Sequence, residues 1–242
     1  MSARSVMAAV AVTTMSMSLA ACGGSLDNPE TGGAGDGTTV KVGYISPLTG
    51  PLAAFGEGDQ YVVDQMTQYF KDNPIEAAGK EYSVEIILKD SQSDPKRAGE
   101  VAADLINNDG VNVLMAHATP ETTVPVAQQC EANGIPCITA DTPWQPWVAG
   151  LGANPGDPST ALTWSHHFFW GLEDITAVEM DIWSQVDTNK RVGAFFANDA
   201  DGQAFTDPKL GQPAMVEPAG YTYDNPGLYP AGTQDFSAQI SQ

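Results

Sequence analysis

Two titratable side chains, His117 and Asp141, each follow an apolar run of the chain and could share acid–base chemistry. An Asp/His pair of this kind could support hydrolysis. The sequence contains no nucleophile elbow, zinc-binding helix or phosphate-binding loop, and Gly56-Glu57-Gly58 lacks the third glycine of a dinucleotide fingerprint. These residues therefore favour a binding protein over an enzyme, and they predict no cofactor.

A second group of polar residues is better suited to holding a ligand. Thr119-Pro120-Glu121-Thr122 opens a predicted helix directly after a strand, where first-turn amides and the positive helix end suit a carboxylate or amide oxygen. The same residues are also those of a plain helix cap. Pro120 and Pro143 lack the N–H that a carboxylate would use, which weakens the prediction of an amino-acid head group.

The other polar and aromatic candidates each have two readings. Trp144 lies in a Pro/Gly-rich segment and could stack on a ligand or pack in the core. His166 and His167 point opposite ways in a strand, so at most one, His167, would face a ligand; a structural histidine is the alternative. Asp201, in an Asp/Gly loop after a strand, could meet a ligand amine or belong to an ordinary turn. We expect no metal site, since these histidines and the acidic loop lack a full ligand set.

Cys22 has a different chemistry. A basic start, the uncharged stretch 5–21 and Leu19-Ala20-Ala21-Cys22 are typical of a secretory signal that ends at a bacterial lipid-attachment site. This predicts an extracytoplasmic protein that is lipid-anchored to the cell membrane. The alternative is an ordinary cleaved signal with an incidental cysteine.

Cys130 and Cys137 are seven positions apart. In an oxidising exterior they could form a disulfide that joins a helix end to the next strand, or they could be two independent buried thiols.

The charge limits the partners. The formal net charge is −20, which disfavours nucleic acid and anionic lipid headgroups, so an acyl chain would have to provide the membrane contact. A 42% apolar content is typical of a folded globular protein.

Strands and helices alternate along the chain. Strands are expected at 40–44, 82–88, 111–115, 135–140, 162–170 and 191–198, and helices at about 62–70, 95–106, 120–133 and 173–186, with an irregular excursion over 143–160. This alternation predicts an α/β fold with a Rossmann-like parallel sheet and helices on both faces. Ligands of such sheets bind beyond the carboxyl ends of the strands.

The predicted organisation is a signal peptide (1–21), a flexible Gly-rich tether (22–38), an N-terminal ligand-binding lobe (39–169) and a partial second lobe (170–242).

Several segments, taken in order, resemble type 1 periplasmic solute-binding proteins, specifically the leucine/isoleucine/valine-binding-protein-like receptors of ABC importers. They are Val42-Gly43-Tyr44-Ile45-Ser46-Pro47-Leu48-Thr49-Gly50-Pro51 with Phe55-Gly56, the 90–96 loop, Gly134-Ile135-Pro136 and Asp235-Phe236-Ser237-Ala238.

The resemblance implies a receptor that closes two lobes on a small polar solute (an amino acid, amide or small aromatic acid) and delivers it to an ABC importer permease. A ligand sensor of the same fold is the alternative. Compared with the family, the chain stops early in the second lobe, so we expect it to be C-terminally truncated. The ligand contacts that the resemblance implies are Phe55, Ala118, Thr119, Pro120, Asp141, Thr142 and Pro143.

Overall fold

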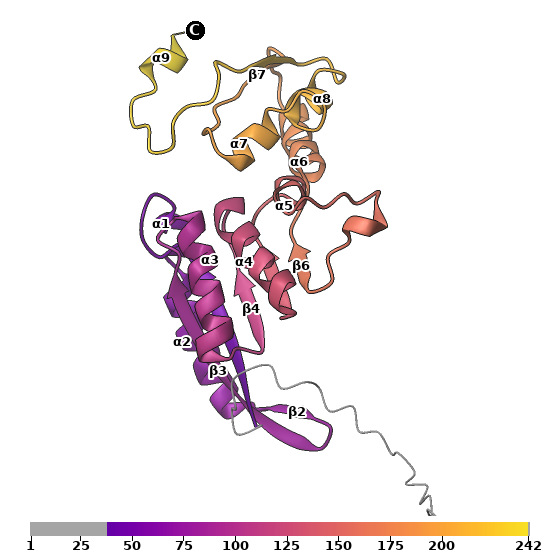
Figure 1. The fold of residues 1–242 in the computed structure, drawn as a ribbon. Helices are drawn as coiled ribbons and strands as arrows, with labels where there is room; N and C mark the ends of the chain where they lie inside the picture. Colours follow the sequence, from indigo (N-terminus) through magenta and orange to yellow (C-terminus); the bar gives the residue numbers. More distant parts are fainter. Residues whose placement is uncertain (1–37, 242) are drawn as a thin grey trace, which may run out of the picture. The chain divides into compact units, whose positions relative to one another are not determined.

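A six-stranded sheet organises most of the computed structural model, which describes residues 38–241 (Figure 1). Neighbouring strands run parallel in the order β2-β3-β1-β4-β5-β6, except that β2 pairs antiparallel with β3. The prediction of an α/β fold built on a parallel sheet is confirmed. The strands are β1 (Thr39–Ser46), β2 (Ile75–Ala77), β3 (Lys80–Asp90), β4 (Val113–Ala116), β5 (Cys137–Ala140) and β6 (Ser165–Phe168).

The longer helices follow strand ends, as expected where parallel strands are joined by crossovers. The helix over 95–106 begins one residue after its N-cap Asp94, whose side chain accepts a hydrogen bond from the Arg97 N–H, and it continues as a π-helical turn (Leu105–Asp109). The helices are α1 (Ala53–Gly56), α2 (Asp59–Asp72), α3 (Pro95–Asp104), α4 (Pro120–Asn133), α5 (Trp144–Gly150), α6 (Leu172–Ser184), α7 (Ala200–Phe205), α8 (Gln212–Val216) and α9 (Ser237–Ile240).

The main core lies between the sheet and the adjacent helices α3 and α4 (Figure 1). Alternate strand residues such as Ile45 and Leu114 are fully buried there against Val101 and Leu105 of the α3 region and Val126 of α4. This period-two burial is what the alternating apolar residues of the strands require.

The opposite face of the sheet is covered over only part of its width. Helix α2 packs beside Val42, Tyr44 and Ile86 of β1 and β3. Farther along the sheet, Ile138 is 45% exposed and Phe168 is 82% exposed. The expectation of helices on both faces is thus met above β1 and β3, while the apolar side chains of β5 and β6 on this face meet solvent.

A second, small sheet pairs β7 (Arg191–Gly193) with β8 (Thr222–Asp224) in parallel, and an isolated bridge joins Ala197 to Tyr229. The strand predicted over 191–198 is therefore too long. Its ladder ends at Gly193, and pairing resumes only at the isolated bridge of Ala197 with Tyr229.

The excursion over 143–160 is also more regular than predicted. It begins with the short helix α5, in which Pro146 occupies the first turn, where a proline costs no backbone hydrogen bond. Trp147 is 4% exposed and packs against Val124 and Ala127 of α4. Burial of this one large side chain fixes the segment on the protein.

Cys130 of α4 and Cys137 of β5 are both fully buried and free. The hydrogen bond between the two thiols and the burial of the site raise the pKa of the Cys130 thiol, so it stays protonated. Of the two alternatives for this pair, the structure contains the two buried thiols and not the disulfide.

The predicted lipidation site Cys22, the signal peptide (1–21) and nearly all of the tether (22–38) lie outside the described residues. Over 38–241, no helix is both long enough and apolar enough to cross a membrane.

Candidate ligand-binding site

The strand order places β1 between β3 and β4, so the connections that leave β1 and β4 diverge at their carboxyl ends. Such a switch point is where open parallel sheets bind ligands. Two residues just beyond β4 and β5 have positive φ angles, Ala118 at 99° and Asp141 at 65°. Positive φ is uncommon in residues other than glycine, and strain of this kind concentrates at binding sites.

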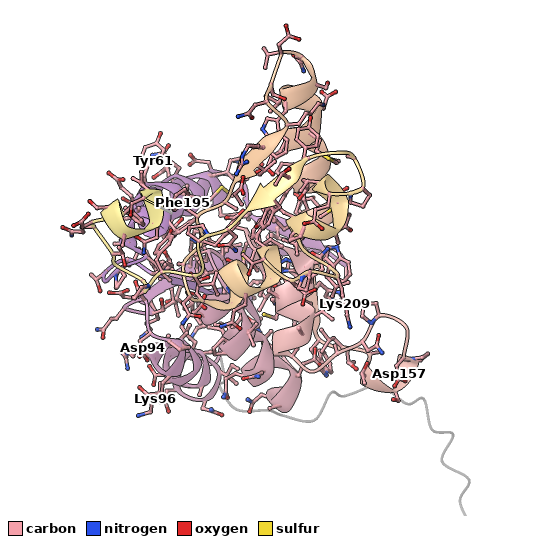
Figure 2. The ribbon with its side chains drawn as sticks, turned by 90° about the horizontal axis from the view of Figure 1, so that it is seen from above. Tyr61, Asp94, Lys96, Asp157, Phe195 and Lys209 are labelled. Atoms are coloured by element: carbon pink, nitrogen blue, oxygen red, sulfur yellow. The ribbon has the colours of Figure 1, made fainter. Side chains whose placement is uncertain are left out.

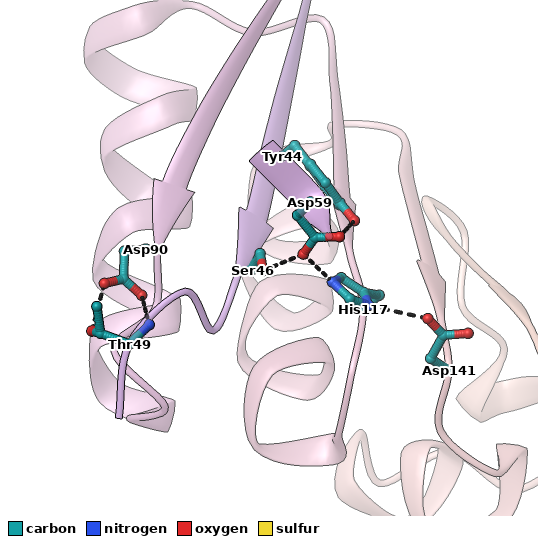
Figure 3. A network of polar contacts seen from close by, with 7 residues as sticks. All are labelled: Tyr44, Ser46, Thr49, Asp59, Asp90, His117 and Asp141. Carbon is teal, nitrogen blue, oxygen red and sulfur yellow. Dashed lines mark hydrogen bonds and ion pairs between the residues drawn. The ribbon is translucent and has the colours of Figure 1, made fainter. Parts of the chain in front are cut away.

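A polar network crosses this edge of the sheet (Figure 3). Asp59, the first residue of α2, accepts hydrogen bonds from the hydroxyls of Tyr44 (3.0 Å) and Ser46. The His117 Nε2 lies 2.6 Å from an Asp59 oxygen, and the His117 Nδ1 lies 3.0 Å from an Asp141 oxygen. Sequence reasoning found His117 and Asp141 but missed Asp59. The only sequence feature that pointed to Asp59 was a carboxylate near the start of a predicted helix.

The network fixes its members in place and engages both ring nitrogens of His117. Both ring nitrogens of His117 face carboxylates, and its side chain is 12% exposed. Burial and the neighbouring Asp59 raise the pKa of Tyr44, which keeps the phenol protonated as a donor. An Asp/His hydrolase needs a nucleophile on the second ring nitrogen, and Asp59 occupies that position here.

Thr119 is the N-cap residue of α4, as predicted, but its side chain makes no capping hydrogen bond. The residue is 7% exposed, and its Oγ1 has no hydrogen-bond partner. Burying a hydroxyl without a hydrogen-bond partner costs free energy. A polar group that bonded to Thr119 would therefore stabilise the protein. Pro120 follows as the first residue of α4 and supplies no N–H.

Thr142 is fully buried beyond β5 and is held by His167 of β6. The His167 Nε2 donates to the Thr142 carbonyl (2.7 Å), its Nδ1 lies 2.8 Å from the Thr139 hydroxyl, and its ring stacks on Trp147 at 4.7 Å. Burial lowers the pKa of His167. Both ring nitrogens of His167 are thus engaged by protein groups in this structure.

Thr142 also connects the end of β5 to helix α7. Its hydroxyl donates to the Asp201 carboxylate of α7 (3.1 Å), and the Ala200 N–H of α7 donates to Glu121 of α4 (3.2 Å). Burial raises the pKa of Asp201 to about 7 despite the hydrogen bond from Thr142, and the charges of Glu121 and Asp199 add to the rise. Asp201 and Ala200 of α7 thus lie against Thr142 and Glu121, from which they are 59 and 79 positions apart in the chain.

The two aromatic candidates are placed differently from each other. Trp144 is the first residue of α5 and not a loop residue, and its Nε1 donates to Glu173 of α6 (3.1 Å). Phe55 of α1 is 54% exposed beyond β1 and remains available for contact. Glu173 was missed at the sequence level because nothing in a helix start indicates a distant indole.

Metal-ligating side chains do not converge: within residues 38–241 there is no group of three or more His, Cys, Asp or Glu arranged to hold an ion. What the edge offers is hydrogen-bonding groups, carboxylates and one exposed aromatic. This chemistry suits a small organic ligand.

Comparisons with known proteins agree with the fold. A curated relative, the Leu/Ile/Val-binding protein homolog 3 of Brucella melitensis, is 31% identical over 102 residues, which are 41% of this chain and 26% of that protein. The leucine-, isoleucine-, valine-, threonine- and alanine-binding protein of Pseudomonas aeruginosa is 29% identical over 105 residues, which are 42% of this chain and 26% of that protein.

Solved structures extend the likeness over most of the chain. A leucine-binding protein from Thermotoga maritima superposes with a TM-score of 0.65 at 21% identity, covering 84% of this chain and 52% of that one. A solute-binding protein of Rhodopseudomonas palustris HaA2 in complex with p-hydroxybenzoic acid gives a TM-score of 0.64 at 17% identity, covering 84% of this chain and 50% of that one.

The chain therefore spans about half the length of these solved structures, and its matched segment about a quarter of the curated relatives. The family model described as periplasmic binding protein matches residues 39–242. This match confirms the resemblance seen in the sequence, and the chain belongs to the periplasmic binding protein family.

Proposed function

We propose that this protein is an extracytoplasmic solute-binding receptor that holds a small polar organic ligand beyond the carboxyl ends of its strands and presents it to an ABC importer permease. Its relatives include proteins named for branched-chain amino acids and solved structures with bound isoleucine or hydroxybenzoate. Capture without conversion fits a site in which the one central histidine is held between two carboxylates.

The observation that carries the proposal is the start of α4. The buried Thr119 hydroxyl there has no protein partner, and it lies at the strand edge where Glu121 and Thr142 contact α7. A ligand that bonds to Thr119 of α4 and to α7 would favour the close approach of these two helices, which is the physical basis of hinge closure. The proposed contacts are Phe55, Ala118, Thr119, Pro120, Asp141, Thr142, Pro143 and Asp201, with Trp144 and His167 supporting them.

Titration calorimetry of the purified full chain tests this function. The probes are leucine, a short amide and 4-hydroxybenzoate, each paired with an amine of similar carbon skeleton. At least one of these compounds should bind with one-to-one stoichiometry. Thr119→Val keeps the side-chain shape and removes the hydroxyl, so affinity should fall about tenfold, the worth of one hydrogen bond. Thr222→Val, at an exposed strand position, is the matched control. Turnover of any probe, or equal affinities in the two variants, would contradict the proposal.

The N-terminal predictions remain part of the proposal. A lipid on Cys22 would tether the receptor outside the cytoplasm, and residues 22–38 would act as its tether. Mass spectrometry of the membrane-extracted protein should find diacylglyceryl mass on the Cys22 peptide. Cys22→Ser should release the protein into the soluble fraction.

A further inference from the structure

Two connections at the carboxyl edge of the sheet are joined by one carboxylate. Asp90, the last residue of β3, accepts hydrogen bonds from the N–H (3.2 Å) and the hydroxyl (2.6 Å) of Thr49, which lies in the 47–56 segment after β1 (Figure 3). It also accepts a hydrogen bond from the Gln92 N–H (2.7 Å) of its own turn. Burial alone would raise the pKa of Asp90, but these hydrogen bonds outweigh burial and lower it, so the carboxylate stays charged at neutral pH.

Ser93 makes a second connection between the same two segments. Its hydroxyl accepts a hydrogen bond from the Leu52 N–H (3.0 Å) and donates one to the Thr49 carbonyl (2.6 Å). In this turn Gln92 and Ser93 have φ angles of 55° and 57°, in the left-handed region that costs free energy for residues other than glycine. Strain of this kind persists only where surrounding contacts hold it, so the two segments fix each other.

The close approach of the two segments leaves no room for a side chain at Gly50. Its φ is 89°, and a Cβ there would lie 2.7 Å from the Gln92 carbonyl oxygen and 2.9 Å from the Ser93 Cβ. Both distances are shorter than van der Waals contact. This observation is independent of the hydrogen bonds, and it shows that the 47–56 segment packs directly on the turn after β3.

The same segment holds the backbone on both sides of Phe55. The Phe55 N–H donates to the carbonyl of Leu52 (2.9 Å), the residue that Ser93 holds. On the other side, Gly56 is buried, and a Cβ there would lie 2.6 Å from the Pro47 carbonyl oxygen. The Phe55 side chain is nevertheless 54% exposed. A large apolar side chain is thus presented to solvent at the ligand edge on a fixed backbone.

We propose that Asp90 and Ser93 are positioning residues, which hold the 47–56 segment so that Phe55 is already in place when a ligand binds. A side chain that is ordered in advance does not have to be ordered during binding, so less of the interaction free energy is lost. This inference rests on the proposed function, in which Phe55 contacts the ligand, and it gives a role to two residues that act through Phe55.

A double-mutant cycle tests whether Asp90 acts through Phe55. Calorimetry on the purified full chain uses whichever of leucine, 4-hydroxybenzoate and their paired amines binds the wild type most tightly. Asp90→Ala should weaken binding about three- to tenfold, the cost of ordering one side chain during binding. The same substitution in a Phe55→Ala background should cause no further loss. Asp90→Asn should restore most of the affinity, because its amide can still accept from both backbone N–H groups and can donate to the Thr49 hydroxyl.

Hydrogen exchange measures the hold on the segment without any ligand. Peptides that cover 47–56 should exchange faster in Asp90→Ala, Ser93→Ala and Gly50→Ala than in the wild type, while peptides of the core helix α4 should not change. Ser93→Ala removes only a neutral hydroxyl, so it keeps the test decisive if Asp90→Ala does not fold. Melting curves check that each variant is folded.

Asp157→Ala is the matched control. Asp157 also accepts from a backbone N–H (2.9 Å) and a hydroxyl (2.7 Å), both of Ser159, so the substitution removes a similar set of hydrogen bonds. Figure 2 shows Asp157 well apart from Asp94, which follows Ser93 at the end of the turn after β3. This variant should change neither the exchange of the 47–56 segment nor the affinity for the probe.

The outcomes separate this inference from the function on which it rests. Unchanged exchange of the 47–56 segment would overturn the positioning role and leave the receptor function standing. Faster exchange with unchanged affinity, or an equal loss of affinity with and without Phe55, would overturn it as well. Binding of no probe by the wild type would overturn the proposed function and the positioning role with it.

Discussion

At the scale of single residues, Asp201 makes the stability of the protein depend on pH. Its carboxyl titrates near pH 4 in an unfolded chain and at about 7 in the fold, where burial disfavours the charged form. Between these values the folded state binds more protons than the unfolded state. The stability that Asp201 contributes is therefore fully present below about pH 4 and is lost as the pH rises through about 7.

Asp201→Asn should consequently stabilise the ligand-free protein at pH 8 by on the order of 2 kcal/mol, a gain that disappears toward pH 4. Urea unfolding at several pH values measures it, with the exposed Asp187→Asn as control. A difference between wild type and Asp201→Asn that does not change with pH would show that Asp201 does not titrate in this window.

Glu131 of α4 is a second residue with a measurable role. Its carboxylate accepts hydrogen bonds from the backbone N–H groups of Thr163, Trp164 and Ser165, at 2.7–3.0 Å. Burial alone would raise its pKa, but these backbone hydrogen bonds outweigh burial and lower it. The carboxylate thereby fixes the start of β6 on α4.

Glu131→Gln offers one carbonyl oxygen in place of two charged ones, so at least one backbone N–H loses its partner. We expect a loss of roughly 1–2 kcal/mol in the free energy of unfolding at pH 7. The loss should shrink in acid, once the pH falls through the lowered pKa of Glu131 and the wild-type carboxylate becomes protonated as well. Glu217→Gln, at an exposed position, is the control for urea unfolding.

At the scale of elements, two glycines of neighbouring helices should respond oppositely to alanine. Gly134 ends α4 with a φ of 69°, where a Cβ is strained, while Gly99 lies inside α3, where a Cβ would meet the Pro125 side chain at an ordinary 3.6 Å. Gly134→Ala should destabilise the protein by about 1 kcal/mol, and Gly99→Ala should stabilise it by about 0.5–1 kcal/mol. Melting temperatures that shift in the same direction for both would contradict this assignment.

At the scale of the whole molecule, the sheet face that α2 leaves uncovered should promote association between copies of the protein. Met115, Ile138 and Phe168 lie on one face and are 39%, 45% and 82% exposed. Contiguous exposed apolar surface of this kind promotes association. Binding of the dye ANS and concentration-dependent sedimentation should both be strong in the wild type and reduced in an Ile138→Thr/Phe168→Thr double variant.

Replacing Leu210 and Ile240, two exposed apolar residues away from this face, with threonine is the matched control. Equal dye binding by the wild type and both double variants would show that the face does not drive association. Thr is a good strand residue, so the double variant should retain β5 and β6.

Local patterns accounted for the elements and for several of their ends. The helix start after Asp94, the helix end before Gly134 and the strands over 40–44 and 82–88 lie where the sequence predicts them, because each depends on residues close in the chain. The short helix α5 was missed, since its stability comes from burial of Trp147 against α4. The limited length of β7 was missed as well, since strand pairing there depends on a segment distant in the chain.

Composition and order along the chain determined the α/β class, the family resemblance and the acidity of the segments beyond the strands. Tertiary structure alone decided which of those groups meet: Asp59 with His117, Thr142 with Asp201, and Glu121 with Ala200. Backbone hydrogen bonding and side-chain periodicity act over a few residues, so they can be read locally. The partners of a buried charge depend on chain segments brought together by packing, and no local pattern encodes them.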